Sequence, residues 1–404
     1  MGVHDLPQLI KSETGTHAMK QKNISSFKGM KVAVDTSLLV HKMGIGSRGS
    51  GVDMVNKDGQ LTSHLCLTFY KILQFLENGM TPIFVFDGKP PDLKNTTLGS
   101  RAAIKSNALA KMNEIEDTTS GEYIKYFKQT FKPTINDYNE LKIMLDLMGI
   151  PYISAPGEAD TVLSWLASRE NESGEKFVDG VCSEDSDMLP HGSPYLFKNM
   201  LDALGKNGFV TVIDLDKTLK HMDITMNQFI DICLLLGCDF CNRIKNVGPK
   251  KIYNLIKTRK NLRNVIKFLK EESLTNKKII VDKDNVKCMF SAREYFRNSV
   301  SELDDILKIK KKDISLKLFH CDELIDFMCN KHDFSRTRIE SGIKKLSIYY
   351  AKMGIIEKNT QIIYKMTQAS PLDDFIFMSD SEDSNSNEII SGEYEFVSES
   401  DSDN

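Results

Sequence analysis

Seven acidic residues between positions 35 and 239 stand at or just beyond the ends of short apolar runs. They are Asp35, Asp87, Glu158, Asp160, Asp185, Asp187 and Asp239. A carboxylate that closes a β-type apolar run normally faces the mouth of a sheet. Several carboxylates gathered there repel one another at neutral pH unless cations or protons neutralise them. The pattern therefore predicts a divalent-metal site suited to phosphoryl-transfer chemistry.

The ligand type indicates which metal this would be. Hard oxygen ligands without histidine or thiolate favour Mg²⁺ or Mn²⁺ over zinc. Two such ions about 3.5–4 Å apart can clamp the attacking and leaving oxygens of a phosphodiester, so that no protein nucleophile is needed. Taken singly, each acid has a structural alternative, since Asp35 could cap a helix, and Glu158 and Asp160 could decorate a first helical turn.

The elements that would position these acids alternate along the chain. Continuous apolar runs predict strands at Met30–Asp35, Pro82–Asp87, Pro151–Ala155 and Phe177–Ser183. Helical patterns lie between them at Ser63–Asn78, Tyr138–Met148 and Ala159–Arg169. This alternation indicates a parallel α/β sheet, in which ligands bind at the carboxyl ends of the strands.

Two further segments point to a polyanionic partner. Asn95–Lys132 is polar and helix-prone with interleaved basic residues, and is either a solvated helix pair or a basic arm over the active site. Asn227–Leu236 predicts a helix that leads into Asp239, and Asn246–Lys251 then opens a helix at Ile252–Thr258. Backbone N–H groups and lysines at such a helix start form a phosphate clamp, although Pro at a helix start is common in itself.

The net charge of −3 hides an uneven distribution. Residues 371–404 hold eleven acids and no Lys or Arg, so 53 basic residues stand against 45 acidic ones in 1–370, a balance of +8. A basic body suits nucleic acid, because Lys and Arg gain affinity by releasing phosphate counterions. The acidic, Ser-rich end is predicted to be disordered.

Other features predict an intracellular protein without a membrane span. No apolar run approaches the ~20 residues needed to cross a bilayer, and the N-terminus has no signal pattern. The eight cysteines are scattered, as expected of reduced thiols. Cys238 and Cys241 form a lone C-x-x-C, which we interpret as two packed residues beside Asp239 in preference to a metal or redox pair.

Several motifs, in order over about residues 1–350, closely resemble the flap endonuclease family of structure-specific 5′ nucleases. They include MGVHDLPQLI, KVAVDTS, TSHLCLTFYK, FVFDGKPPDLK, LMGIPYISAPGEAD, SEDSDML, LLLGCDFC, IKNVGPKK and FMCNKHDFSRTRIESGIKKLS. The last block resembles the flap endonuclease branch more than the exonuclease, Holliday-junction or excision-repair branches. The resemblance implies a PIN-like or Rossmann-like parallel-sheet nuclease core with a helical arch and a helix–two-turn–helix.

The resemblance also implies roles for individual residues. Asp35, Asp87, Glu158 and Asp160 would hold the first Mg²⁺ of each subunit, and Asp185, Asp187 and Asp239 the second, with Mn²⁺ as a substitute. Lys94 and Arg101 would reach the scissile phosphate from the base of the arch. The DNA contacts would come from Gly2, His41, Arg48, Lys71, Gly248, Lys250 and Lys251, with K⁺ at the helix–two-turn–helix as in some relatives.

This sequence departs from the family pattern at several positions. Asp5 and Asn246 stand where the family usually has Gly, His41 replaces a stacking Tyr, and Asp160 is shorter than the usual Glu. A degenerate motif for the sliding clamp (PCNA) is formed by Gln368, Leu372, Phe375 and Phe377, and an acidic tail stands in place of a basic one.

We therefore predict a monomeric, nuclear, Mg²⁺-dependent 5′ flap endonuclease that acts on flap-containing duplex DNA in replication and repair. The alternatives are a 5′–3′ exonuclease or excision-repair-type nuclease, or a catalytically inactive DNA-structure-binding protein. A dehalogenase-type phosphatase is disfavoured, because VAVDTS lacks the second Asp. The predicted divisions are 1–94, 95–135 (arch), 136–258, 259–350, 351–378 (linker with the clamp motif) and 379–404 (tail).

Overall fold

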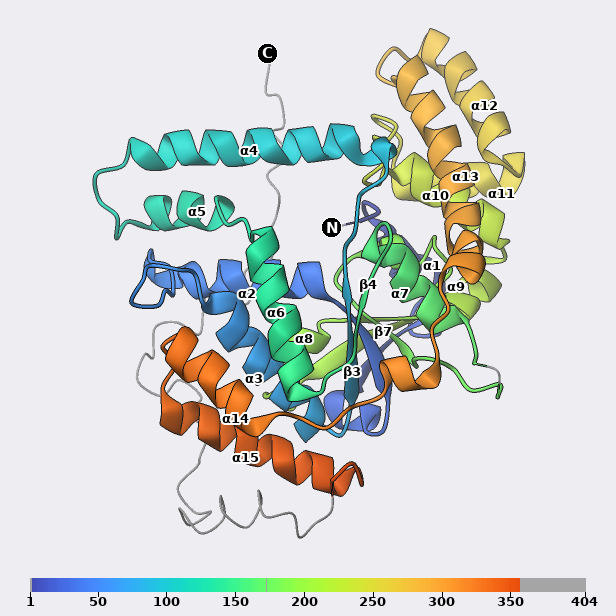
Figure 1. The fold of residues 1–404 in the computed structure, drawn as a ribbon. Helices are drawn as coiled ribbons and strands as arrows, with labels where there is room; N and C mark the ends of the chain where they lie inside the picture. Colours follow the sequence, from blue (N-terminus) through green and yellow to red (C-terminus); the bar gives the residue numbers. More distant parts are fainter. Residues whose placement is uncertain (1, 172, 357–404) are drawn as a thin grey trace. The chain divides into compact units, whose positions relative to one another are not determined.

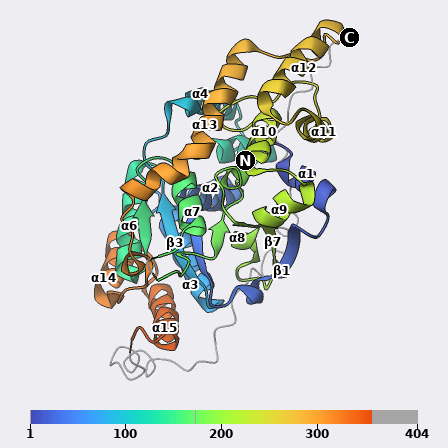
Figure 2. The same cartoon turned by 90° about the vertical axis from the view of Figure 1, so that its right-hand side faces the viewer.

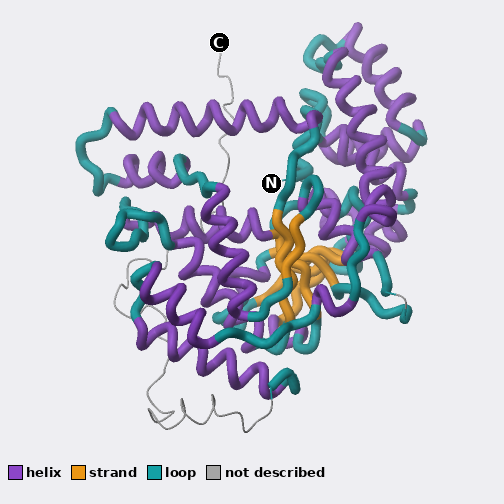
Figure 3. The backbone as a smooth tube through the Cα atoms, viewed as in Figure 1, coloured by secondary structure: helices purple, strands orange, loops and turns teal. Residues whose placement is uncertain are grey.

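The computed structural model describes residues 2–171 and 173–356 of the 404-residue chain. Within this part, a seven-stranded sheet lies between two sets of helices, as Figures 1 and 3 show. The strand order is β1-β7-β6-β5-β2-β3-β4. The strands are β1 (Met19–Asn23), β2 (Lys31–Asp35), β3 (Thr81–Phe86), β4 (Tyr152–Ser154), β5 (Gly180–Cys182), β6 (Tyr195–Lys198) and β7 (Phe209–Asp214).

The predicted parallel sheet is confirmed in β5, β2, β3 and β4, which are neighbours and run parallel. The apolar side chains of β5, β2 and β3 are buried on both faces, because helices cover both sides of the sheet, whereas β4 at the edge is only partly buried. Asp35 lies opposite Val85, and Phe86 lies opposite Ser154. The carboxyl ends of these strands therefore meet at one edge of the sheet.

The other half of the sheet was not predicted from the sequence. β6 pairs parallel to β5, and β7 then pairs antiparallel with both β6 and β1. β1 is polar and largely exposed (MKQKN), so it has no apolar run to identify it. Its pairing with β7 is a tertiary contact between segments far apart in the chain.

Helices cover the two faces separately. One face carries α2 (Thr36–Ser47), α3 (Ser63–Glu77) and α6 (Ile135–Met148), against which α14 (Cys321–Ile325) and α15 (Arg336–Lys352) pack. The other carries α1 (Leu6–Thr14), α7 (Ala159–Ser168) and α9 (Leu215–Met222). The short helix α8 (Met200–Ala203) lies on the side of α2 and α3, because Lys42 of α2 pairs with Asp202 and Lys71 of α3 donates to the carbonyl of Leu201. In α3, Leu65, Phe69, Ile72 and Leu76 recur at helical spacing and are fully buried, which fixes the face that it turns inward.

Two helical assemblies stand beyond the carboxyl ends of the parallel strands (Figures 1 and 2). The first is the pair α4 (Asn95–Asn113) and α5 (Gly121–Gln129), which we call the arch. The second comprises α10 (Met226–Leu236), α11 (Pro249–Arg259), α12 (Leu262–Thr275) and α13 (Lys283–Ile306). A capping box of Thr225 and Gln228 begins α10, and Pro249 occupies the first turn of α11.

The predicted helices agree with the structure to within a few residues, and a further segment, 322–329, which we also expected to be one α-helix, changes character part-way along. There α14 ends at Ile325 and passes into a π-helical segment, Asp326–Lys331. The described residues form one compact unit. The predicted internal divisions stay predictions, and the clamp motif and acidic tail lie outside the described residues. None of the described helices is long and apolar enough to cross a membrane.

Candidate active site

The carboxyl edge of the sheet positions the predicted acids. Asp35 ends β2 and also caps α2, because its Oδ1 accepts the N–H of Leu38 at 3.0 Å. Its Oδ2 accepts the hydroxyl of Ser183, beyond β5, at 3.1 Å. Burial, with the nearby charge of Asp87, raises the pKa of Asp35 to about 7. Capping and a place in the acidic cluster are therefore compatible at this residue.

Asp87 and Glu158 follow the neighbouring strands β3 and β4. Asp87 Oδ1 accepts the N–H of Ala159 at 2.8 Å, and its Oδ2 accepts the hydroxyl of Ser37. Glu158 is 4% exposed and precedes α7, without capping it through its side chain. Burial raises its pKa, and the ammonium of Lys94 opposes that change.

The remaining acids of the cluster are held against one another. Asp185 Oδ1 accepts the N–H of Asp187 at 2.9 Å. Burial raises the pKa of Asp160 and of Asp187, and in both the charge of Asp185 adds to the effect. Asp187 Oδ1 is buried and has no hydrogen-bond partner among the described residues. Such an orphaned oxygen is costly unless a cation or a proton satisfies it.

Two cations from the start of the arch enter the cluster. Lys94 Nζ forms ion pairs with Glu158 and, at 3.3 Å, with Asp239 Oδ2. One guanidinium nitrogen of Arg101 lies 2.8 Å from each oxygen of Asp239. Burial alone would lower the pKa of Lys94, but the carboxylates of Asp160, Glu158 and Asp239 outweigh it and raise that pKa. The structure thus joins both predicted phosphate contacts to the acidic cluster.

The residues at this edge fit divalent cations. Seven carboxylates face the two positive charges of Lys94 and Arg101, and burial and mutual repulsion raise the pKa values of several of them. The donors are carboxylate oxygens, the set that Mg²⁺, Mn²⁺ and Ca²⁺ prefer. The arrangement is therefore suited to metal-assisted hydrolysis of a phosphate ester.

Comparison with known proteins is consistent with this chemistry. Residues 1–108 match the XPG N-terminal domain, and residues 149–239 match the XPG I-region. Over 348 residues the chain is 37% identical to Flap endonuclease 1 of Meyerozyma guilliermondii, an alignment that covers 86% of this chain and 89% of that protein. The chain belongs to the flap endonuclease family. It is a structure-specific nuclease, a metal-dependent hydrolase with a role in DNA replication and repair.

More distant similarities support the same family and fold. Human Flap endonuclease 1 is 30% identical over 368 residues, which is 91% of each chain. The solved structure of flap endonuclease-1 from Methanococcus jannaschii matches with a TM-score of 0.59 and 26% identity, over 83% of this chain and 97% of that one. The catalytic core of Rad2 with DNA substrate matches with a TM-score of 0.62 over 85% of this chain and 100% of that one, and at 22% identity shows the fold alone.

Gly2 of this flap endonuclease lies directly against the acidic cluster. A Cβ atom on Gly2 would stand 2.0 Å from Asp185 Oδ1 and 2.7 Å from the backbone nitrogen of Ser186. Gly2 also has a φ of +81°. Asp5, one of the departures from the family pattern, adopts a left-handed φ of 55° and pairs with Arg243 at 3.0 Å. Asp tolerates this conformation better than most residues, which explains the replacement of Gly.

Two predicted DNA contacts lie under the arch. His41 is half-buried on α2, edge-on to Phe131 at 5.8 Å, and burial together with Lys105 and Arg101 lowers its pKa to about 4. Arg48 is 8% exposed and stacks on Phe127 at 4.3 Å. The Arg48 guanidinium also binds Asp53 and the carbonyl of Phe127. Arg48 therefore holds α5 in place, and its contact with DNA stays a prediction.

The other predicted DNA contacts lie apart from the acidic cluster. Lys71 donates to the carbonyl of Leu201 at 2.6 Å, and burial lowers its pKa to about 8. Gly248, Lys250 and Lys251 are exposed at the start of α11, as the predicted phosphate clamp requires. Asn246, the second Gly replacement, has a φ of 61°, so the turn keeps the left-handed residue that a Gly would supply.

One group of metal-type ligands was missed from the sequence. His64, Asp137 and Glu140 have ligand atoms within 4.8 Å of one another. The helical spacing of Asp137 and Glu140 was the only available signal, since His64 lies far away in the chain. Cys238 and Cys241 are buried free thiols with sulfurs 3.7 Å apart, and they belong to no such group of three ligands in the described part of the chain.

Proposed function

We propose that this enzyme hydrolyses one phosphodiester of a 5′-flap DNA, near the junction of the single strand and the duplex, with two Mg²⁺ ions per chain. The observation that carries the proposal is the meeting of Lys94 and Arg101 with the acidic cluster at the base of the arch. A site with this charge pattern can hold cations and a phosphate together.

In this proposal the carboxylates would divide between the two ions. Asp35, Asp87, Glu158 and Asp160 would hold one ion; Asp185, Asp187 and Asp239 would hold the other. Bound Mg²⁺ supplies an activated water and neutralises charge on the departing 3′ oxygen. Mn²⁺, which takes the same oxygen ligands, would substitute.

Lys94 and Arg101 would stabilise the phosphate. Without DNA, their positive charges are paired with Glu158 and Asp239. A scissile phosphate offers both groups a second anionic partner, and charge that develops on it in the transition state strengthens the contact. Because both residues stand where the arch begins, threading of a single strand beneath α4 would bring its phosphates to them.

The duplex and the junction of the substrate would be bound by residues outside the acidic cluster. The start of α11, with Gly248, Lys250 and Lys251, would hold the duplex backbone, with K⁺ at the turn. Gly2, His41, Arg48 and Lys71 would contribute further contacts near the junction. The motif at Gln368, Leu372, Phe375 and Phe377 would bind the sliding clamp, and the enzyme would act as a monomer in the nucleus.

A gel assay tests the proposal. The protein is offered a 5′-flap DNA, a nicked duplex and a bubble with Mg²⁺ or EDTA, beside Asp185→Asn and the exposed control Asp216→Asn. We expect flap cleavage that needs Mg²⁺, that is lost in Asp185→Asn and that is kept in the control, while flap binding survives. Tight flap binding without cleavage by the wild type would contradict the proposal, and cleavage of the bubble without flap preference would indicate excision-repair-type specificity.

A further inference from the structure

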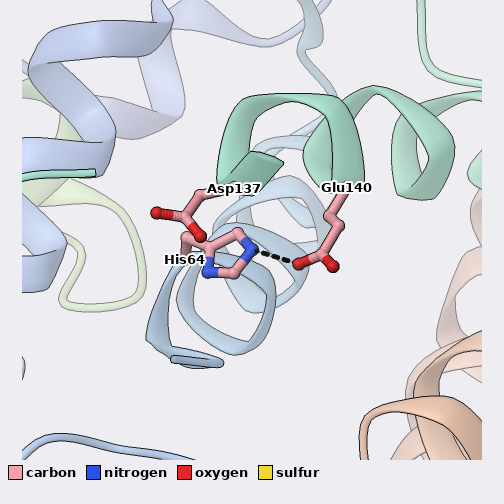
Figure 4. A group of neighbouring side chains, drawn as sticks. All are labelled: His64, Asp137 and Glu140. Carbon is pink, nitrogen blue, oxygen red and sulfur yellow. Dashed lines mark hydrogen bonds and ion pairs between the residues drawn. The ribbon is translucent and has the colours of Figure 1, made fainter. Parts of the chain in front are cut away.

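A second cluster of metal-type ligands lies between α3 and α6. His64 stands in the first turn of α3, and Asp137 and Glu140 stand one turn apart on the facing side of α6, as Figure 4 shows. All three are shielded from solvent, with exposures of 1% for His64 and 7% for Asp137 and a side-chain exposure of 13% for Glu140. None of them belongs to the acidic cluster at the sheet edge.

The spacing of these groups matches ligands of one ion. His64 Nε2 lies 3.2 Å from Glu140 Oε2, and all three ligand atoms lie within 4.8 Å of one another. Zinc bonds of about 2.0–2.1 Å in tetrahedral geometry place two ligand atoms about 3.3 Å apart. Small rotations of the side chains would therefore close the set around one ion. Asp137 Oδ2 caps α6 through the N–H of Thr134, which leaves its Oδ1 for the ion.

Unpartnered nitrogens at the same place are an independent observation. His64 Nδ1 and both ring nitrogens of His332 are buried without a hydrogen-bond partner among the described residues. His332 is 2% exposed and follows the π-helical segment Asp326–Lys331. Burial lowers its pKa, and charges on Glu140 and Lys331 and the ring of His64 also act on it. His332 is not one of the three residues whose ligand atoms lie within 4.8 Å of one another, so the orphaned nitrogen of the cluster itself is His64 Nδ1.

The charge at this place is also unbalanced. With neutral imidazoles, Asp137 and Glu140 leave two negative charges in a largely water-free interface. One divalent ion would balance them, and imidazole with carboxylate is a ligand set that zinc uses. We propose that His64, Asp137 and Glu140 form a structural site for Zn²⁺ or a similar first-row transition ion, separate from the nuclease centre.

The place of this site in the fold suggests what it does. It ties α3 to α6, and α6 is the first helix after the arch. Tyr138, one of the two residues between its acids, packs edge-on against Phe86 of β3, with ring centroids 6.2 Å apart. An ion between α3 and α6 would thus steady the helix that leads from the arch back into the core.

The test compares the zinc content of the wild type with that of variants that lack one of the proposed ligands. Full-length protein, stripped with a chelator, is dialysed against Zn²⁺ in saturating Mg²⁺, and bound zinc is measured by mass spectrometry. The variants are Glu140→Gln, which keeps size and hydrogen bonding, and His64→Gln, with the exposed His221→Gln as control. Thermal unfolding is followed with and without Zn²⁺, and circular dichroism checks that each variant is folded.

We expect wild type and His221→Gln to hold one Zn²⁺ per chain more than Glu140→Gln and His64→Gln. Their melting temperatures should rise with Zn²⁺, and those of the two ligand variants should not. Loss of a residue that only supports a metal ligand typically lowers metal affinity by about 10–100-fold. Loss of a ligand itself should lower zinc affinity at this site by at least as much. Equal zinc content and equal thermal response in wild type and folded Glu140→Gln would overturn the proposal and leave a plain His64–Glu140 ion pair.

Discussion

Lys94 is the residue that links the arch to the chemistry. It is largely buried and contacts two acids that belong to different parts of the fold. Glu158 lies between β4 and α7, and Asp239 follows α10. The sequence suggested Lys94 through family resemblance alone, since nothing in its spacing relates it to either acid. Its contacts give it a physical role, which is to balance charge where a phosphate would enter.

Replacement of Lys94 by Met should slow flap cleavage more than it weakens flap binding. Loss of one preorganised charge-stabilising group typically lowers the rate by about 10²–10³-fold. Single-turnover cleavage under saturating Mg²⁺, with binding measured in Ca²⁺, separates the two effects. The matched control is Lys89→Met, an exposed lysine just before the arch. A rate loss explained by weaker binding would argue against a role for Lys94 in the transition state.

Gly2, which family resemblance predicted as a DNA contact, also lies against Asp185, and only the structure reveals that proximity. The Cβ of an alanine would overlap Asp185 Oδ1. It would also stand too close to the backbone nitrogen of Ser186, which cannot move aside as a flexible side chain could. Gly2→Ala should displace Asp185 and lower the cleavage rate by about 10²-fold, the size of effect that a 1 Å misplacement can have. Gly46→Ala, where a Cβ meets nothing within 4 Å, is the control. Equal rates for the two variants would show that Asp185 tolerates the shift.

At the scale of elements, the arch depends on aromatic contacts at its return to the core. Phe131 is buried against Gly44 of α2, where even a Cβ would stand 2.0 Å from the ring. Arg48 lies over Phe127 and Phe131 and donates to the carbonyl of Phe127. The arch is therefore fixed at α4 by ion pairs and after α5 by packing.

Arg48→Met distinguishes anchoring of the arch from contact with DNA. If Arg48 anchors α5, its loss should destabilise the protein by about 1–3 kcal/mol and increase proteolysis within 95–132. If it contacts a DNA phosphate, the slope of log affinity against log salt should fall by about one without loss of stability. We expect the first result, measured by thermal unfolding and limited proteolysis. An unchanged melting temperature with a reduced salt slope would favour the DNA contact.

Some elements of the fold could be predicted from the sequence and others could not. The parallel strands β2 and β3 were predictable because both faces are buried, so their apolar runs are continuous. β1 was not, because an exposed edge strand carries polar side chains. In the site, acids at strand ends were predictable from local pattern. Gly2 and Asp185, and likewise His64 and Glu140, come together from distant segments of the chain. Local sequence patterns do not predict such contacts.

At the scale of the whole molecule, charge separates the chain into a basic part and an acidic end. Residues 1–370 carry a balance of +8, whereas residues 371–404 hold eleven acids and no Lys or Arg. We predict that the acidic segment competes with DNA phosphates for the basic part of the chain. Its effect would be electrostatic, so it should be strong at low salt and weak above the ionic strength at which charges are screened.

A chain shortened after Ser370 should therefore bind flap DNA more tightly than the full-length chain at low salt. The difference should shrink as salt is raised, since counterion release and competition by the acidic segment are both screened. The control is a full-length variant in which the eleven acids of 371–404 are changed to Asn or Gln, which removes charge and keeps length. Both proteins should show the same gain in affinity by fluorescence anisotropy across a salt series. A gain in the shortened chain alone would mean that the length of the segment matters and its charge does not, and equal affinity of all three proteins would show that the acidic end does not compete with DNA.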